Sequence, residues 1–219
     1  MNNTPKLIVM LTHNDHTVEN ASEIFESCKH SNAEYWGFKE KPLPISEMKS
    51  LFSKMKSCGK TTFLEVVEYD EESGLQGARI AKECGCDILM GTVFFDSINQ
   101  FCKENNIKYM PFVGQITDRP SILEGSIEHM ISQAKEYLAK GFDLLGYRYT
   151  GDPIELNNTF IQAVQAPVCL AGSIDSYERL DEVIEANPWA FTIGSAFFEE
   201  KFGTKIHEQI NNVCNYLKK

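Results

Sequence analysis

Eight short apolar runs, each separated from the next by enough chain for one helix, constrain the fold of this chain most. They start near Lys6, Glu34, Thr62, Asp87, Lys108, Phe142, Pro167 and Trp189. Their mean spacing is about 26 residues, near the lower end of what eight strand–helix units need. Most of the runs are apolar throughout, which is typical of parallel strands covered by helices. The pattern predicts an α/β fold, a (β/α)8 TIM barrel, with one domain over residues 1–219.

Glycines at the expected helix ends support this interpretation. Gly59, Gly85 and Gly141 each stand just before the next apolar run, where a helix commonly ends in a left-handed residue. The alternative fold is an open doubly wound sheet, which places a glycine-rich turn after its first strand. The residues at that place, Thr12–Asp15, read THND and do not form such a turn.

The charge of the chain limits its partners. The formal net charge is −10, with 31 acidic against 21 basic residues, and the basic residues form no cluster. This balance disfavours nucleic acid and anionic membranes as partners. An anionic ligand would therefore have to be held by local donors. Two copies of the chain could also pair as a homodimer.

The cysteines and the N-terminal region indicate a cytoplasmic protein. The seven cysteines include no CxxC pair, so we expect reduced thiols. The apolar run Leu7–Leu11 is too short for a secretion signal or a membrane-spanning helix. His13 and His16 have no acidic or cysteine partner at ligand spacing, so neither a metal nor another cofactor is expected.

Two glycine turns near the C-terminus indicate a phosphate site. Gly172–Ser173 follows the seventh apolar run, and Gly194–Ser195–Ala196 follows the eighth. In (β/α)8 barrels the loops after strands 7 and 8 frequently bind phosphate. Glycine allows the backbone to approach an anion closely, and the N–H groups at a helix start point toward it. Tight turns without a ligand are the alternative interpretation.

These turns resemble those of the ribulose-phosphate-binding barrel superfamily, which includes isomerases of the tryptophan and histidine pathways and sugar-phosphate epimerases. In that superfamily strand 7 typically ends in Gly-Gly or Gly-Ser, and strand 8 in Gly-Ser-Ala. The resemblance implies that Gly172, Ser173, Gly194, Ser195 and Ala196 bind phosphate. The decarboxylases of the superfamily carry Asp-x-Lys-x-x-Asp on strand 3, whereas this chain has LEVVEYD and no lysine there.

Three residues at the expected strand ends are candidates for catalysis. Glu65 lies inside the third apolar run, so it should point into the barrel, where burial would favour its protonated form and suit it to proton transfer. Lys39 ends the second strand and could act as a base, as a Schiff-base nucleophile or as a partner of Glu65. His13 ends the first strand and could be an acid or a base. Structural roles, such as pairing of Glu65 with a buried cation, are the alternatives.

Other strand ends offer residues that could bind substrate. Arg148 stands between two tyrosines and could hold a phosphate or a carboxylate, or pair with an acidic neighbour. Thr92 ends the fourth strand and Gln115 follows the fifth. The connection that contains residues 117–125 is the longest, and it is either a lid over the site or a plain surface loop.

A second resemblance covers most of the chain. The segment TFLEVVEYDEESGL, the Cys84–Asp87 stretch before ILMGT, and PVCLAGSID are similar in layout to the glycerol-uptake operon antiterminator barrels, which are regulators that bind glycerol 3-phosphate. Those proteins usually carry His-x-Asp where this chain has Glu65–Val67. The difference falls at ligand-facing positions.

The sequence therefore leads to two functional hypotheses. The first is an isomerase, epimerase or lyase that acts on a small phosphorylated metabolite, with Glu65 exchanging a proton and Lys39 or His13 as the complementary acid. The second is a glycerol 3-phosphate-sensing, antiterminator-like regulatory barrel without catalytic activity. The charged residues at the strand ends favour the enzyme.

Overall fold

A closed barrel of eight parallel strands forms the centre of the molecule. The computed structural model describes residues 4–218. The strands follow one another around the barrel in the order β1-β12-β11-β10-β7-β6-β5-β4. Their bounds are Lys6–Met10 (β1), Tyr35–Lys39 (β4), Thr61–Val66 (β5), Ile88–Val93 (β6), Lys108–Phe112 (β7), Phe142–Leu144 (β10), Val168–Leu170 (β11) and Ala190–Ile193 (β12). Each strand begins within one residue of a predicted start, and the predicted barrel is confirmed.

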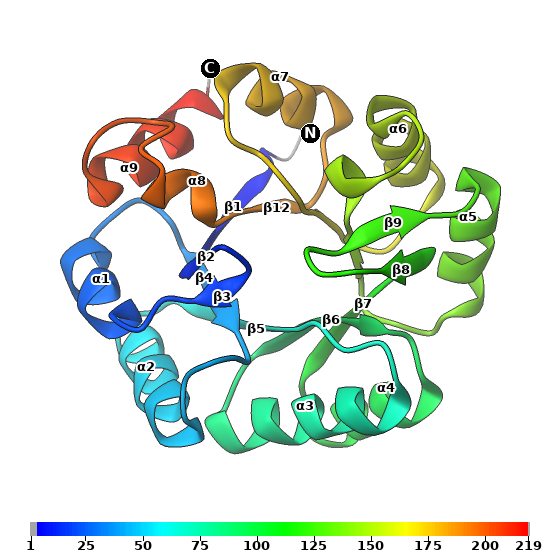
Figure 1. Ribbon diagram of the computed structural model, residues 1–219, viewed down its shortest axis with the longest axis horizontal. Coiled ribbons are helices and arrows are strands. Elements are labelled where there is room, and N and C mark those ends of the chain that lie inside the picture. Colours follow the sequence, from blue (N-terminus) through cyan, green and yellow to red (C-terminus); the bar gives the residue numbers. More distant parts are fainter. Residues whose placement is uncertain (1–3, 219) are drawn as a thin grey trace.

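The helices surround the barrel as an outer ring (Figure 1). They are Ala21–Cys28 (α1), Ile45–Ser57 (α2), Glu71–Cys84 (α3), Asp96–Glu104 (α4), Ile127–Glu136 (α5), Pro153–Ala163 (α6), Tyr177–Ala186 (α7), Ser195–Phe198 (α8) and Ile206–Tyr216 (α9).

Local sequence sets several of the helix ends. Asp70 caps α3 by accepting a hydrogen bond from the Ser73 N–H, and Gly85 ends the helix in a left-handed conformation. No described helix is long and apolar enough to cross a membrane.

Alternation along the strands divides the core into two layers. On β5 the side chain of Phe63 lies in the barrel interior with Met90 and Met110, whereas Leu64 and Val66 lie in the larger core between barrel and helices. Because successive side chains of a strand point to opposite faces, Glu65 points to the interior with Phe63. The register of the sheet places Glu65 beside Lys39 of β4 and Met90 of β6.

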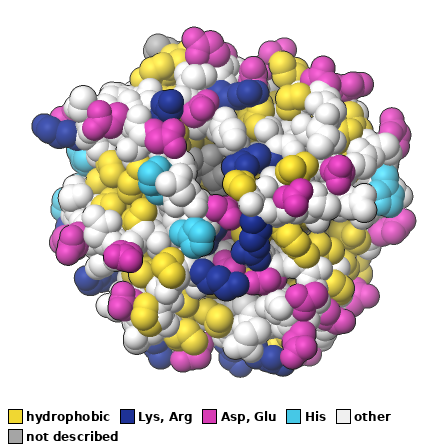
Figure 2. All heavy atoms as spheres, in the orientation of Figure 1, with side chains coloured by type: hydrophobic (Ala, Val, Ile, Leu, Met, Phe, Trp, Pro, Cys, Tyr) yellow, Lys and Arg dark blue, Asp and Glu magenta, His cyan; other side chains and the backbone are white. Residues whose placement is uncertain are grey.

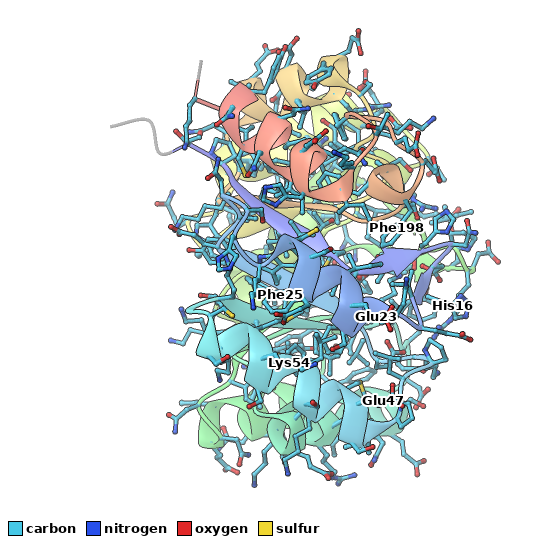
Figure 3. The ribbon with its side chains drawn as sticks, turned by 90° about the vertical axis from the view of Figure 1, so that its left-hand side faces the viewer. His16, Glu23, Phe25, Glu47, Lys54 and Phe198 are labelled. Carbon is cyan, nitrogen blue, oxygen red and sulfur yellow. The ribbon has the colours of Figure 1, made fainter. Side chains whose placement is uncertain are left out.

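Two short hairpins at the mouth of the barrel were not predicted. One consists of β2 (Thr12–His13) and β3 (His16–Thr17), and the other of β8 (Gln115–Thr117) and β9 (Ile122–Glu124). Both lie over the opening of the barrel in Figure 1. A short 3-10 helix, η1 (Gly146–Arg148), follows β10 at the same end. In the side view of Figure 3, His16 of β3 and Phe198 of α8 mark this end of the molecule.

Candidate functional site

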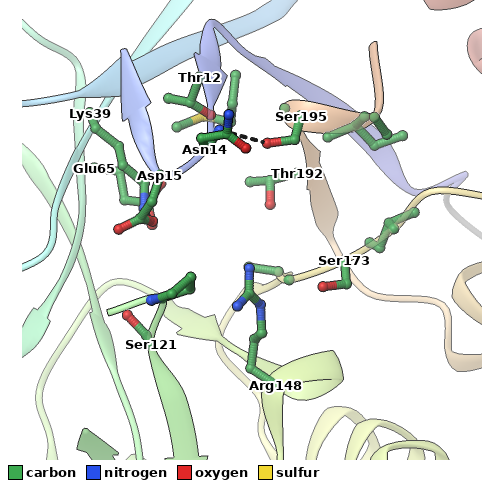
Figure 4. A pocket seen from close by; sticks show the side chains of 18 of the residues that line it. Thr12, Asn14, Asp15, Lys39, Glu65, Ser121, Arg148, Ser173, Thr192 and Ser195 are labelled. Atoms are coloured by element: carbon green, nitrogen blue, oxygen red, sulfur yellow. Dashed lines mark hydrogen bonds and ion pairs between the residues drawn. The ribbon is translucent and has the colours of Figure 1, made fainter. Parts of the chain in front are cut away.

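A cavity of about 560 Å³ opens at the carboxyl ends of the barrel strands. Side chains of Lys, Arg, Asp and Glu surround the hollow at the centre of this face (Figure 2). Lys39 and Glu65 form one side, and Arg148 and Ser173 lie across from them (Figure 4). The cavity therefore has an acid–base side and a side rich in backbone N–H groups.

The turn after β11 forms the N–H side together with Arg148. Gly172 has φ +92° and Ser173 has φ +36°, so the backbone turns sharply there. A Cβ atom added to Gly172 would lie 2.8 Å from Cγ of Arg148, because the arginine side chain packs against this glycine. Within residues 4–218, the N–H groups of Gly172 and Ser173 donate no hydrogen bond and the Arg148 guanidinium has no ion pair. Gly172, Ser173 and Arg148 all line the cavity.

The turn after β12 lies against the first hairpin. Gly194 approaches so closely that an added Cβ would lie 2.5 Å from Oγ1 of Thr12. The Asn14 N–H donates to Oγ of Ser195 over 3.2 Å, the contact drawn in Figure 4. Gly194, Ser195 and Ala196 all line the cavity, as Gly172 and Ser173 do. The structure thus brings the five residues predicted to bind phosphate to one cavity.

The acid–base side is a cluster of three charged residues. Nζ of Lys39 lies 3.6 Å from Oε1 of Glu65 and is hydrogen-bonded to Oδ1 of Asp15. The side chains of Lys39 and Glu65 are only 12% and 13% exposed. Burial lowers the pKa of Lys39, but the charges of Glu65 and Asp15 outweigh burial and hold this pKa above its ordinary value. Lys39 is therefore an ammonium ion at neutral pH, a proton or hydrogen-bond donor rather than a free-amine nucleophile.

Asp15 was missed by the sequence analysis, although its turn carries a signal. Asn14 and Asp15 have φ +48° and +66° and connect two strands of two residues each. Asn-Asp at the two central positions fits a hairpin turn that needs positive φ at both. This turn places the Asp15 carboxylate over Lys39.

The second hairpin covers the cavity from the opposite side and holds Arg119 and Ser121 at its lining. Oη of Tyr69 lies 2.8 Å from Oγ of Ser121 and donates to the Asp118 carbonyl over 2.8 Å. The Arg119 guanidinium lies 3.3 Å from Oε2 of Glu68. The loop between β5 and α3 thus anchors the segment for which the sequence left a lid and a plain surface loop as alternatives.

Three of the predicted site residues do not line the cavity. Side chains alternate along β2, so Thr12 faces the cavity and His13 faces α8, where it stacks on Phe198 and lies 3.8 Å from Glu199. Thr92 has φ +63°, and its buried hydroxyl lies 2.5 Å from the hydroxyl of Tyr109.

Gln115 is displaced for a different reason. The chain leaves the barrel after β7, so Gln115 begins the second hairpin and is exposed. Among the described residues, no group of three or more His, Cys, Asp and Glu side chains could hold a metal ion.

Comparison with known proteins identifies the fold. No protein-family model and no curated protein matches the chain. Among solved structures, N-(5'-phosphoribosyl)anthranilate isomerase from Pyrococcus furiosus superposes with a TM-score of 0.69 at 15% identity, over 98% of each chain. The tryptophan synthase alpha chain from Legionella pneumophila has a TM-score of 0.65 at 11% identity, over 98% of this chain and 92% of that one. The shared fold is the (β/α)8 barrel.

A regulatory protein has the same fold. The glycerol uptake operon antiterminator regulatory protein from Listeria monocytogenes superposes with a TM-score of 0.61 at 16% identity, over 88% of this chain and 93% of that one. Both resemblances noted in the sequence are thus represented among proteins of similar structure. Since enzymes and a regulator share this fold, the function has to be argued from the cavity.

Proposed function

We propose that the chain binds a small phosphorylated metabolite in the cavity and catalyses a proton transfer on it, as an isomerase, epimerase or lyase. The observation that carries the proposal is the position of Arg148. Its guanidinium has no carboxylate partner within residues 4–218, although the chain has an excess of ten negative charges. It lies against the Gly172 turn and in the same cavity as Glu65 and Lys39.

The anion site follows from the chemistry of these donors. A guanidinium presents several N–H groups in a fixed plane and binds phosphate oxygens in pairs. The N–H groups of Gly172 and Ser173 add neutral donors beside it, and Ser195 adds a hydroxyl. A cavity of about 560 Å³ is within the usual range for a small-molecule site. These features support a ligand of metabolite size with its phosphate at Arg148.

The charged residues on the other side support proton transfer. Glu65 would accept a proton from a carbon next to a carbonyl group, and the electron pair of the broken C–H bond would move onto the carbonyl oxygen. The Lys39 ammonium would stabilise the resulting oxyanion, with Asp15 holding the ammonium in place. Delivery of a proton to the opposite face of the same carbon completes an epimerisation, and delivery to the neighbouring carbon completes an isomerisation.

The alternative is a glycerol 3-phosphate-sensing regulatory barrel without catalytic activity. It would use the same anion site. It would leave the largely buried pair of Lys39 and Glu65 without a chemical role, so this pair favours the enzyme.

A binding experiment tests the anion site. Arg148→Met keeps much of the length of the side chain and removes its charge, and Arg79→Met makes the same change on an exposed position of α3. Calorimetric titration with inorganic phosphate, glycerol 3-phosphate and a panel of sugar phosphates should show a loss of affinity in Arg148→Met alone. Equal affinities in the two variants would place the anion elsewhere.

An exchange experiment separates the enzyme from the regulator. Each sugar phosphate is incubated with the protein in deuterium oxide, and mass spectrometry follows deuterium incorporation at carbon. An enzyme incorporates deuterium into its ligand and Glu65→Gln does not. A regulator binds glycerol 3-phosphate with the same dependence on Arg148, but no member of the panel gains deuterium.

A further inference from the structure

A carboxyl group below the cavity is not explained by the proposed reaction. Asp143 lies on β10, is 1% exposed, and is not among the residues that line the cavity. The register pairs it with Cys169 of β11, which belongs to the barrel interior. Neither carboxylate oxygen of Asp143 has a hydrogen-bond partner in the described part of the chain.

Within residues 4–218, no Lys, Arg or His side chain forms an ion pair with Asp143. Glu65 adds a second negative charge from β5, and Lys39, the cation that acts on Asp143, is already paired with Glu65 and Asp15. Cys169 is buried beside Asp143 as a neutral thiol. The interior core cluster that contains Cys169 is otherwise apolar and includes Met10 of β1, Met90 of β6, Met110 of β7 and Ala190 of β12.

An ionised carboxylate in this place would be very unfavourable. Removal of an unpaired charge from water costs several kcal/mol, and buried carboxyl groups usually take up a proton instead. Burial, and after it the charge of Glu65, raise the pKa of Asp143 well above its ordinary value, against the opposing effect of Lys39. The effect of Glu65 reflects the general rule that two neighbouring carboxylates resist simultaneous ionisation.

We propose that Asp143 is an uncharged, protonated acid at neutral pH and forms with Glu65 a carboxyl pair that carries a single negative charge. The role of the pair rests on the proposed function. An uncharged Asp143 leaves Glu65 as the charged carboxylate opposite Lys39, ready to accept a proton from the ligand. Asp143 is in this sense a positioning residue, because it touches no ligand and acts on Glu65 through its protonation state.

Infrared spectroscopy of the ligand-free protein tests the proposal directly. The carbonyl stretch of a protonated carboxyl group is separate from the carboxylate bands, and isotope labelling of aspartate identifies it. The wild-type protein should show this band at neutral pH, and Asp143→Asn should lack it. Glu40→Gln is the control. Burial raises the pKa of Glu40 as well, so a protonated Glu40 could contribute a band of its own, and the aspartate band should remain in this variant.

Removal of Glu65 tests the coupling within the pair. In Glu65→Gln the negative charge beside Asp143 is gone while Lys39 remains, so the aspartate band should disappear at a pH about one unit or more below that of the wild type. A merely structural Asp143 would not respond in this way. If the band disappeared at the same pH in Glu65→Gln and wild type, the proposed coupling of Asp143 to Glu65 would be wrong. If wild-type protein lacked the band at neutral pH, the proposed protonation of Asp143 would be wrong.

Stability provides a second readout that also needs no ligand. A folded-state pKa above the unfolded value means that the folded protein binds more protons, so the contribution of Asp143 to stability falls as the pH rises above about 4. Asp143→Asn should therefore gain stability relative to wild type between pH 5 and 8 in denaturant titrations. A difference that stays constant over this range would contradict the proposal.

Asp87→Asn is the matched control with the opposite sign. Burial raises the pKa of Asp87, but hydrogen bonds from Lys56 and Thr62 outweigh it and hold this pKa below its ordinary value. Its contribution is present at neutral pH and is lost in acid, so the variant should be less stable than wild type at neutral pH. These measurements need neither phosphate nor a substrate, so their failure is distinguishable from failure of the anion site.

Discussion

Glu65 and Lys39 lie side by side because the register of β4 and β5 makes them neighbours. The same alternation that sends Leu64 and Val66 into the helix layer turns Glu65 toward the cavity. A single residue at an alternating position is thus enough to place a carboxylate in the apolar interior, and Lys39 compensates its charge.

Replacement of Glu65 by glutamine should abolish most of the proposed activity. Glu65→Gln retains the shape of the side chain and removes proton transfer, which typically contributes about 10²–10⁴-fold in rate. We expect turnover to fall by that factor with ligand affinity little changed, as measured by steady-state kinetics and calorimetry. Glu72→Gln, on the exposed face of α3, is the control. Unchanged turnover in Glu65→Gln would leave Glu65 with a structural role only.

Gly172 tests whether the turn positions Arg148. In Gly172→Ala the backbone has φ +92° and the added Cβ atom would lie 2.8 Å from Cγ of Arg148. In Gly59→Ala the backbone has φ +72° and the added Cβ atom would have no neighbour within 4 Å. The left-handed conformation costs roughly 1–2 kcal/mol in either variant. Only Gly172→Ala should also displace the guanidinium and weaken phosphate binding. Equal binding by the two variants would show that Arg148 tolerates the extra methyl group.

At the scale of elements, the hairpin of β8 and β9 is the segment that covers the cavity from the side of β5. It projects from the barrel and is tied to the loop after β5 through Tyr69 and Arg119. Its tip lies on the cavity, since Pro120 and Ser121 are lining residues. Any ligand that enters from this side passes these contacts.

Tyr69→Phe should loosen the hairpin and leave the barrel intact. The substitution removes the hydroxyl contacts to Ser121 and Asp118, each worth about 0.5–1.5 kcal/mol. We expect faster amide hydrogen exchange over residues 115–124 and unchanged exchange in the barrel strands. Tyr35→Phe, which loses a hydrogen bond from Lys6, should not affect the hairpin. Equal exchange in Tyr69→Phe and wild type would show that the other contacts of the segment, such as those of Arg119 and Leu123, hold it without the tyrosine hydroxyl.

The elements differ in how far local sequence could predict them. The eight strands depend on short apolar runs and the two turns on glycine, so both could be predicted from the local sequence. The hairpins are built from strands of two or three residues, too short for a periodic pattern. His13 was expected at the end of a barrel strand, but it lies on β2, where the alternation of side chains turns it away from the cavity and onto Phe198 of α8.

Only those parts of the candidate site that depend on local sequence could be predicted. Glu65, Lys39 and Arg148 follow from their positions at strand ends. Asp143 carries the same signal as Glu65, a charged residue within an apolar run, but its strand has only three residues. Asp15 and Arg119 reach the cavity through hairpins, and contacts of this kind depend on tertiary structure rather than on spacing along the chain.

At the scale of the whole molecule, the two glycine turns lie beside the seam where the barrel closes. β12, near the C-terminal end, pairs with β1, near the N-terminal end, and also with β11. A phosphate bound between Gly172 and Ser195, with Arg148 after β10, would connect three successive strands next to this seam. Binding there should stabilise the closed barrel as a unit.

Thermal unfolding measures this effect. At a ligand concentration of 100 times Kd, binding to the folded state alone adds about 2.7 kcal/mol, which corresponds to a rise in Tm of roughly 5–10 °C for a chain of this size. Gly172→Asp with Ser195→Asp places two carboxylates in the turns and should abolish the rise. Gly59→Asp with Ser53→Asp adds the same charges at exposed positions and should retain it. The scans are made at constant ionic strength, because the net charge of −10 repels any anion until salt screens it. Equal stabilisation of both double variants would show that the ligand binds away from the seam.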